Sequence, residues 1–472
     1  MVDQSLPESA RRNSPARGRR RVRLGGVLTA VLLLLAGTWT AGAGPAQAAP
    51  RAVPIAAPAE SRGAAKAPRP VIFVHGFSGS GGQFDSQARR LTSNGYPATW
   101  IEAHEYDSLF ATNTREQVYA GLDERITRLL AATGADRIDL LAHSLGTALM
   151  QAYLNSSPQR AARVAHYVNL DGASATAPPG NVPTLAVWGE GDPARTIVGA
   201  TNVALPNQAH TQTVSSPETF AAFYRFFTGR EPKTTRIVPQ RGPVVLAGRA
   251  VLFPSNVGVT DATLQVYTVH PRTGTRLRHR PDATFRLTGD GSFGPFRGRG
   301  DVRYEFAIVR PGAPVHHLYF QPFRRTDRLI RLLSSLPGQG LAALTENSPT
   351  STNLVISRQK EWWGDQGAAG DSLTVDGREI LNAATSPRSK RTIGIFTFDK
   401  GLDKTTDLTA PIPAFFSQPF ISAVDLYVPA STPPSRTVRV VVRPRGGGAP
   451  DVLTVPNWPS STDRISLEFD ND

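Results

Sequence analysis

Ser144 stands in the pentapeptide Ala142-His143-Ser144-Leu145-Gly146, directly after a predicted strand (IDLLA) and at the start of a predicted helix. A nucleophilic serine on such a strand-to-helix turn needs small neighbours, because they relieve crowding around a strained backbone. Ala142 occupies a position that is usually glycine, and it adds only a methyl group. The pattern predicts a nucleophile at Ser144. The alternative is an ordinary serine in a strand–helix turn.

Two backbone amides are expected to stabilise the negative charge that attack by Ser144 would create. Leu145 begins the predicted helix, where amide N–H groups have no partner within the helix. The second amide should come from the loop after the predicted strand VIFV, and we assign it to Phe77. His75, at the start of this loop, is interpreted as a structural residue rather than a base.

The general base should lie on a loop that follows the nucleophile in the chain. His210, in the segment NQAHT between the last predicted strand and the last predicted helix, satisfies this order. His104 precedes the nucleophile, and His143 is fixed beside it. The histidines beyond residue 230 lie in a region with a different pattern. We therefore predict His210 as the base.

Two carboxylates are candidates for the acid that orients the base. Asp171 follows the predicted strand in VNLDG, and Asp192 follows the next one in WGEGDP. Either would hold the histidine in the productive tautomer and stabilise its protonated form. From the residues alone the choice stays open.

The elements that must position these residues change in character near residue 230. Between residues 68 and 229 short apolar runs alternate with helical patterns, such as 117–131 and 217–227, which indicates a parallel sheet covered on both faces. Beyond residue 230 the period becomes two, with Gly, Pro and Asp turns, which predicts antiparallel β structure. The leucine-rich segment 326–335 is expected to be a short helix between two β sub-domains.

The N-terminus carries the features of an export signal. Seven arginines precede an apolar run (VLTAVLLLLAGTW), and Ala46-Gln47-Ala48 supplies the small-x-small cleavage pattern. An uncleaved membrane anchor is the alternative. The formal net charge is +14, but the arginines are scattered, so nucleic-acid binding is not expected. Cysteine is absent, which excludes thiol catalysis.

The motifs HGFSGS and AHSLG resemble those of small bacterial lipases of the α/β-hydrolase family. LDGASA, NQAHTQTVSSPETF, PVHHLYF and EWWGDQG resemble the archaeal (Archaeoglobus-type) long-chain lipases, in which a C-terminal β-barrel follows the hydrolase domain. The resemblance implies Ser144 as nucleophile, His210 as base and Asp171 as acid, because Asp171 matches the L-D-G position. It also implies fatty-acyl ester substrates and a β region that helps to receive the lipid.

Together these features predict a chain of five parts. Residues 1–48 are the signal peptide, 49–66 a flexible linker and 67–231 the α/β-hydrolase catalytic domain. Residues 232–335 are a β domain, and 336–472 are a second β domain or the remainder of one β-barrel region. We expect a chain that ends near Gly229 to keep its reactivity towards a small soluble ester.

The expected function is that of a secreted serine ester hydrolase, a lipase that forms an acyl-enzyme. A polyester depolymerase or a short-chain carboxylesterase would use the same residues, and an inactive surface-binding protein is the remaining alternative. The expected partner is a lipid or ester substrate, with transient contact to a lipid surface and no obligate protein partner. No cofactor is expected. No metal is expected either, since Asp365 and Asp371 lack the spacing of calcium ligands.

Overall fold

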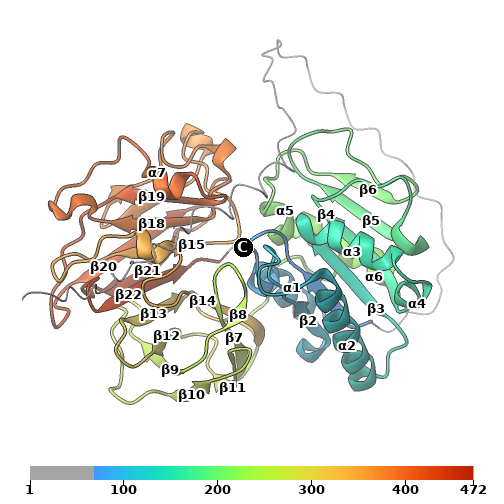
Figure 1. The fold of residues 1–472 in the computed structure, drawn as a ribbon, viewed down its shortest axis with the longest axis horizontal. Coiled ribbons are helices and arrows are strands. Elements are labelled where there is room, and N and C mark those ends of the chain that lie inside the picture. The colour runs from blue at the N-terminus through green and yellow to red at the C-terminus, as the bar shows by residue number, and fades with distance from the viewer. Residues whose placement is uncertain (1–67, 471–472) are drawn as a thin grey trace, which may run out of the picture. The chain divides into compact units, whose positions relative to one another are not determined.

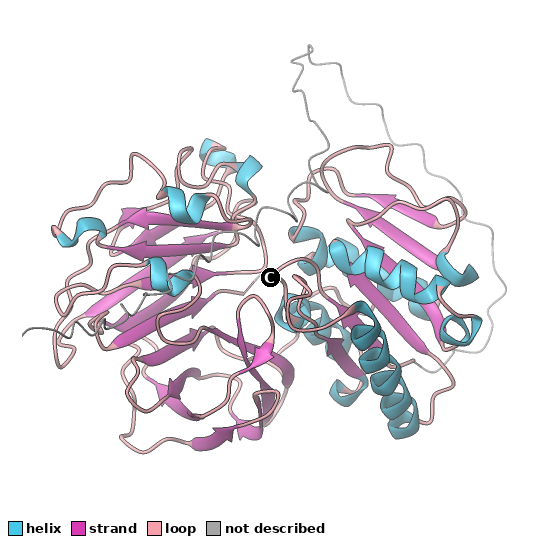
Figure 2. Cartoon of the chain, viewed as in Figure 1, coloured by secondary structure: helices cyan, strands magenta, loops and turns pink. Residues whose placement is uncertain are grey.

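The structure, a computed structural model, describes residues 68–470. Figure 1 shows the order of the elements along the chain, and Figure 2 shows that helices are frequent before residue 230 and strands dominate after it. The predicted signal peptide and linker lie outside the described residues.

A parallel sheet with the strand order β2-β1-β3-β4-β5-β6 forms the centre of the first part. Each strand is separated from the next along the chain by a crossover, as parallel pairing requires. The strands are β1 (Val71–Val74), β2 (Ile101–His104), β3 (Ile138–His143), β4 (Val164–Leu170), β5 (Thr184–Trp188) and β6 (Thr201–Ala204).

Helices cover both faces of this sheet, which confirms the predicted α/β architecture. In β1, Ile72 and Val74 pack with the helices α2 and α3, whereas Val71 and Phe73 pack with α1 and α6. Such a strand is buried on both faces and therefore reads as a continuous apolar run. The helices are α1 (Asp85–Ser93), α2 (Arg115–Thr133), α3 (Leu145–Asn155), α4 (Pro158–Ala162), α5 (Gln212–Ser215) and α6 (Pro217–Thr228).

Helix α6 forms as its sequence predicts. The Ser216 side chain caps the first turn by accepting the amide of Thr219, and Pro217 occupies the position where a missing N–H costs nothing. Phe220, Phe223 and Phe227 lie on one buried face against the sheet. The helix ends at a left-handed glycine.

The β region consists of three sheets. The largest has the order β10-β9-β12-β13-β22-β15-β18-β19, and the smaller ones are β11-β7-β14, with β8 paired to β7, and β17-β16-β20-β21. The strands are β7 (Val244–Leu252), β8 (Val257–Gly258), β9 (Ala262–Val269), β10 (Ala283–Leu287), β11 (Ser292–Gly298), β12 (Arg303–Val309), β13 (Val315–Phe320), β14 (Asp327–Ser334), β15 (Leu354–Ser357), β16 (Ser372–Val375), β17 (Arg378–Glu379), β18 (Gly394–Phe398), β19 (Ile421–Asp425), β20 (Thr437–Arg443), β21 (Asp451–Pro456) and β22 (Asp463–Glu468). A short helix, α7 (Pro413–Phe416), packs on β19.

The pairing in these sheets is mainly antiparallel, as predicted, but it includes parallel pairs. The C-terminal strand β22 lies between β13 and β15 and is parallel to both. The largest sheet therefore runs across the boundary near residue 335 that the sequence suggested. The pairs β7–β14 and β18–β19 are parallel as well.

The prediction of a helix at 326–335 is wrong, because this segment forms strand β14. Its leucines fit a helical stripe, but the segment pairs with β7, and this tertiary contact outweighs local propensity. A register shift between Asp327 and Ile330 explains why the adjacent Leu329 and Ile330 are both buried in a strand.

Candidate active site

Ser144 lies on a strained turn between β3 and α3. Its backbone has φ 52° and ψ −123°, a conformation that non-glycine residues adopt only where the surroundings enforce it. A Cβ on Gly76 would lie 2.8 Å from Ser144 Cβ, and one on Gly146 would lie 2.4 Å from the His75 carbonyl oxygen. The close approach of the two loops thus requires glycine at both positions. Ala142 is fully buried and fits without displacing the turn.

The structure brings His210 into contact with both Ser144 and Asp171. His210 Nε2 lies 2.9 Å from Ser144 Oγ, and His210 Nδ1 lies 2.6 Å from Asp171 Oδ2. The base loop, between β6 and α5, supplies the histidine, and the end of β4 supplies the carboxylate. A proton can therefore pass from the hydroxyl to an imidazole whose other nitrogen is held by a carboxylate.

Asp192 does not contact His210. It is exposed, and its Oδ1 accepts the amide of Ala194 in a turn of the loop after β5. Asp171 is buried, and its second oxygen, Oδ1, accepts from the Gly189 amide (2.8 Å) and from Arg195 Nη1 (2.8 Å). Geometry therefore pairs Asp171 with the base.

The pKa of Asp171 results from opposing effects. Burial by itself raises the pKa of this carboxyl, but the hydrogen bond to His210 and the charges of His210 and Arg195 outweigh burial and lower the pKa to about 2. Asp171 is thus ionised over the pH range in which most ester hydrolases work.

His143 is hydrogen-bonded to the backbone of the loop that carries His210. Its Nε2 lies 3.1 Å from the His210 carbonyl oxygen, and its Nδ1 lies 2.9 Å from Gln83 Nε2. Burial, with the nearby charge of His210, lowers the pKa of His143 well below its ordinary value, so the ring is neutral. This fixes one tautomer, with Nε2–H donating to His210 and Nδ1 accepting from Gln83.

The loop that carries Phe77 is also held in place. His75 is buried, stacks on Tyr106 at 4.4 Å and contacts no reacting group, in keeping with a structural role. Asn256, from the β region, donates to the Gly79 carbonyl at 2.8 Å. Phe77 lines the same cavity as Ser144. Among the described residues, the amides of Phe77 and Leu145 find no protein acceptor.

A buried carboxylate of the β region, Glu361, binds the base loop. Glu361 Oε1 accepts the amide of Thr211, and Oε2 accepts the amide of Gln212 at 3.0 Å. Arg445 adds a bond to the Gln212 side chain at 2.6 Å. The ring of Phe420 stacks against that of His210 at 6.2 Å. The β region thus contacts both the base loop and the ring of the predicted base.

Four of these residues escaped the sequence analysis: Gln83, Arg195, Glu361 and Phe420. Glu361 begins the EWWGDQG motif, but no local pattern assigns a site role to any of the four, because each contacts a residue that is distant in the chain or lies in an irregular loop. Both tryptophans of the EWWGDQG motif are buried. Arg358 lies over Trp362, and Trp363 lies between Arg388 and Arg445.

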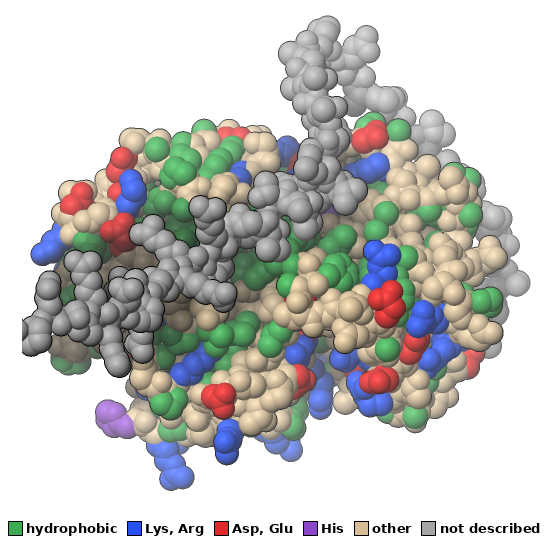
Figure 3. All heavy atoms as spheres, viewed as in Figure 1, with side chains coloured by type: hydrophobic (Ala, Val, Ile, Leu, Met, Phe, Trp, Pro, Cys, Tyr) green, Lys and Arg blue, Asp and Glu red, His purple; other side chains and the backbone are tan. Residues whose placement is uncertain are grey.

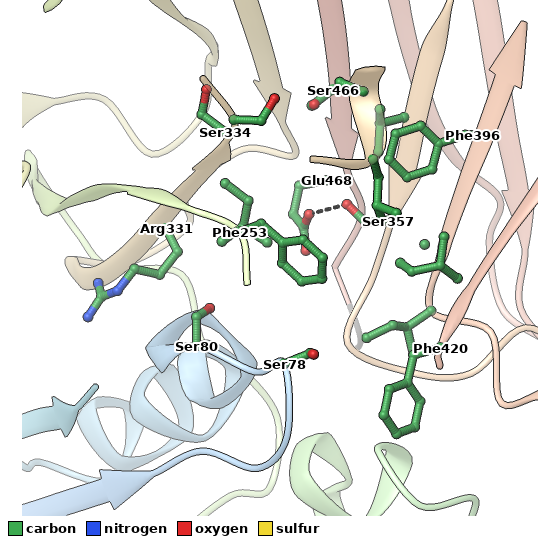
Figure 4. A pocket seen from close by; sticks show the side chains of 18 of the residues that line it. Ser78, Ser80, Phe253, Arg331, Ser334, Ser357, Phe396, Phe420, Ser466 and Glu468 are labelled. Carbon is green, nitrogen blue, oxygen red and sulfur yellow. Dashed lines mark hydrogen bonds between the residues drawn. The ribbon is translucent and has the colours of Figure 1, made fainter. Parts of the chain in front are cut away.

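A cavity of about 190 Å³ extends from Ser144 into the β region. Its wall is mainly apolar and includes Phe253, Leu318, Phe396 and Phe420. Several serines and the carboxyl group of Glu468 interrupt the apolar surface (Figure 4). A hydrophobic pocket with few polar groups is typical of sites that bind small organic ligands.

Within residues 68–470, no three His, Asp or Glu side chains lie close enough to hold a metal ion. On the face drawn in Figure 3, Lys and Arg side chains are interspersed with Asp and Glu.

None of the helices within residues 68–470 combines the length and apolar character needed to cross a bilayer.

Comparison with protein families agrees with this architecture. A model of the alpha/beta hydrolase fold matches residues 69–225, and a model of a lipase C-terminal domain matches residues 242–337. A third model, for another C-terminal domain, matches residues 340–472. Residues 69–225 therefore have the α/β-hydrolase fold.

Solved structures with similar regions include lipase B of Aspergillus fumigatus, at 13% identity and a TM-score of 0.29 over 36% of this chain. The match spans 54% of that lipase, about half of its length. A predicted hydrolase of Thermoplasma acidophilum matches at 19% identity and a TM-score of 0.26, over 34% of this chain and 85% of its own. An extracellular α/β-hydrolase of a Paenibacillus species matches at 24% identity and 0.19, over 23% and 42% of the two chains.

Proposed function

From the α/β-hydrolase fold of residues 69–225, we propose that this chain is a serine ester hydrolase, specifically a lipase that cleaves fatty-acyl esters. The observation that carries the proposal is the chain of contacts from Ser144 through His210 to Asp171. The matches to a hydrolase fold and to a lipase C-terminal domain support a hydrolytic enzyme.

In the proposed mechanism, Ser144 Oγ attacks the ester carbonyl carbon while His210 Nε2 takes the hydroxyl proton. The carbonyl oxygen becomes negatively charged and accepts from the amides of Phe77 and Leu145. Collapse of this intermediate breaks the ester bond, and His210 returns the proton to the departing alcohol. Water, activated by the same imidazole, then releases the fatty acid and regenerates Ser144. Asp171 stabilises the imidazolium throughout.

The proposed substrate is a long acyl chain. The apolar cavity that begins at Ser144 continues along the β region, and burial of methylene groups there would favour long chains by about 0.8 kcal/mol for each CH₂ group. The resemblance to archaeal long-chain lipases supports the same substrate. A polyester depolymerase is the second candidate, because the polar groups of the cavity suit an oxygenated chain. A short-chain carboxylesterase would use the same catalytic residues.

The β region has two proposed roles. It extends the acyl site, and it holds the base loop through Glu361. The second role argues against the expectation that a chain ending near Gly229 keeps its reactivity, since such a chain lacks Glu361, Arg445 and Phe420.

We further propose that the protein is exported and acts at a lipid surface, with cleavage of the signal peptide after Ala48. N-terminal sequencing of protein recovered from the culture medium tests this. A start at Ala49 is expected, and retention of the basic segment in a membrane fraction would favour the anchor.

A chain-length series of nitrophenyl esters tests the proposed substrate. We expect kcat/KM to rise from acetyl to long acyl esters, and Ser144→Ala to remove the activity on all of them. A maximum at the shortest esters would replace the lipase by a short-chain carboxylesterase.

A further inference from the structure

One wall of the cavity is a face of the largest sheet. Along β15 and β22, Ile356 and Leu467 point into the core on the other face. The alternate residues Ser357, Ser466 and Glu468 line the cavity. In the parallel register Ser357 is the partner of Glu468, so their side chains lie next to each other. Figure 4 shows the two facing one another in the pocket.

Ser357 Oγ donates to Glu468 Oε2 at 2.5 Å, and Gln359 also bonds this carboxyl group. The nearby cations are engaged elsewhere: Arg331 bonds Glu105, and Arg464 bonds Ser335. Burial, with the nearby negative charge of Asp470, raises the pKa of Glu468 to about 7. A neutral carboxylic acid is therefore populated near neutral pH, and it can donate as well as accept.

Binding of a purely apolar ligand against Ser357 and Glu468 would be energetically unfavourable. A carboxyl group that keeps unused hydrogen-bonding capacity loses solvation when methylene groups displace water from it, at a cost of roughly 1–3 kcal/mol. A ligand oxygen at the same place would restore the lost bonds. Sites that bind small organic ligands use few polar groups in an apolar wall in this way, to fix orientation and select the ligand.

Ser357, one member of the pair, lies close in sequence to a residue that binds the base loop. Ser357 precedes Glu361 by four residues, and Glu361 binds the base loop. Ser357 and Glu468 line the same cavity as Ser144, so an acyl chain that extends from Ser144 into this cavity can contact both.

We propose that Glu468 and Ser357 form a subsite for an oxygen substituent on the acyl chain, at a position away from the ester that is cleaved. The preferred substrate is then an oxygenated acyl ester rather than a plain hydrocarbon one. The oxygen comes from a hydroxylated fatty-acyl chain or from the repeating ester groups of an aliphatic polyester. This inference rests on the proposed ester hydrolase function.

The test uses the full mature chain and matched long-chain nitrophenyl esters, one unsubstituted and three with a hydroxyl near, midway along or at the end of the chain. For the unaltered protein, kcat/KM for one hydroxylated ester should exceed that of the plain ester by about fivefold or more. Glu468→Leu should abolish the preference, so that kcat/KM for the favoured hydroxylated ester falls to that for the plain ester. Glu468→Gln should retain part of it, because an amide also donates and accepts.

The design also includes Ser357→Ala, which removes the hydroxyl group of the pair, and a control variant at another serine that donates to a carboxyl group. Ser372 likewise donates to a carboxyl group, that of Glu379, but outside the cavity, so Ser372→Ala should leave the preference unchanged. Titration of Ser144 with an organophosphate counts correctly folded sites in each variant. A soluble hydroxyalkanoate oligomer forms a second arm. A Glu468-dependent gain for the oligomer alone identifies the polyester as the source of the oxygen.

The outcomes are distinguishable. Equal rates on all the esters and the oligomer, or equal losses on all of them in Glu468→Leu, overturn the subsite while leaving the hydrolase intact. Absence of Ser144-dependent hydrolysis of every ester overturns the proposed function and the subsite with it.

Discussion

The carboxylate of Glu361 accepts the backbone amide of Thr211, the residue that follows His210, across 150 positions of sequence. Glu361 is fully buried, so the two amides it accepts, from Thr211 and Gln212, have no competing water. A charged acceptor of two N–H groups fixes the start of α5 and, with it, the orientation of the imidazole.

Glu361→Gln should therefore lower kcat while changing KM little, because an amide offers one acceptor to two donors and lets the base loop shift. A displacement of about 1 Å would cost on the order of 10²-fold. Steady-state kinetics measures both constants. Glu305→Gln is the matched control, since Glu305 is equally buried but binds Arg276 and His317. Similar losses of kcat in both variants would reduce the role of Glu361 to general stability.

Removal of the β region should abolish turnover even of small soluble esters. A chain that ends at Gly229 keeps Ser144, His210 and Asp171 but loses the contacts that hold the base loop. Circular dichroism and soluble yield establish whether such a chain folds, and reaction with nitrophenyl acetate measures its turnover. A folded truncated chain with undiminished acetate hydrolysis would show that the β region serves the acyl chain alone.

Substitution of the two candidate acids should separate them. Asp171→Asn should lower kcat by about 10⁴-fold, because the amide favours the wrong imidazole tautomer. Asp192→Asn should leave kcat near its original value, since Asp192 bonds only its own turn. The ratio of the two kcat values is the measurement, and a loss confined to Asp192→Asn would reverse the assignment.

Arg195→Ala should move the acidic limb of the kcat/KM profile to higher pH. Arg195 is bonded to Asp171, and its positive charge, together with the hydrogen bond and charge of His210, lowers the pKa of this carboxyl. Removal of Arg195 raises the pKa of Asp171, so the carboxylate that holds the base is lost at a less acidic pH. Arg195→Lys keeps the charge and should shift the profile less. An unchanged or acid-shifted limb in Arg195→Ala would exclude this electrostatic effect.

Much of this arrangement could be predicted from local sequence. Ser144 and His210 each sit at a chain position that the strand and helix pattern defines, and the structure brings their side chains into contact. The sequence does not decide between the two candidate acids, because Asp171 and Asp192 each follow a parallel strand and therefore come at the same edge of the sheet. The bonds from Gly189 and Arg195, which hold Asp171 in place, depend on tertiary packing.

The β region shows the limits of periodicity. The pattern predicted strands but not their partners, because the pairing of β22 with β13 and β15 involves segments separated by more than a hundred residues. For the same reason the EWWGDQG motif does not indicate that Glu361 binds the base loop. The leucines of segment 326–335 suit either a helical or a strand period, and the pairing with β7 stabilises the strand.

The most direct test of the central proposal is covalent labelling of the purified protein with a fluorophosphonate, followed by peptide mass spectrometry. The account predicts one adduct, on Ser144, and loss of labelling together with ester hydrolysis in Ser144→Ala and in His210→Ala while the fold is retained. Modification of a different serine, or ester hydrolysis that persists in folded Ser144→Ala protein, would contradict it.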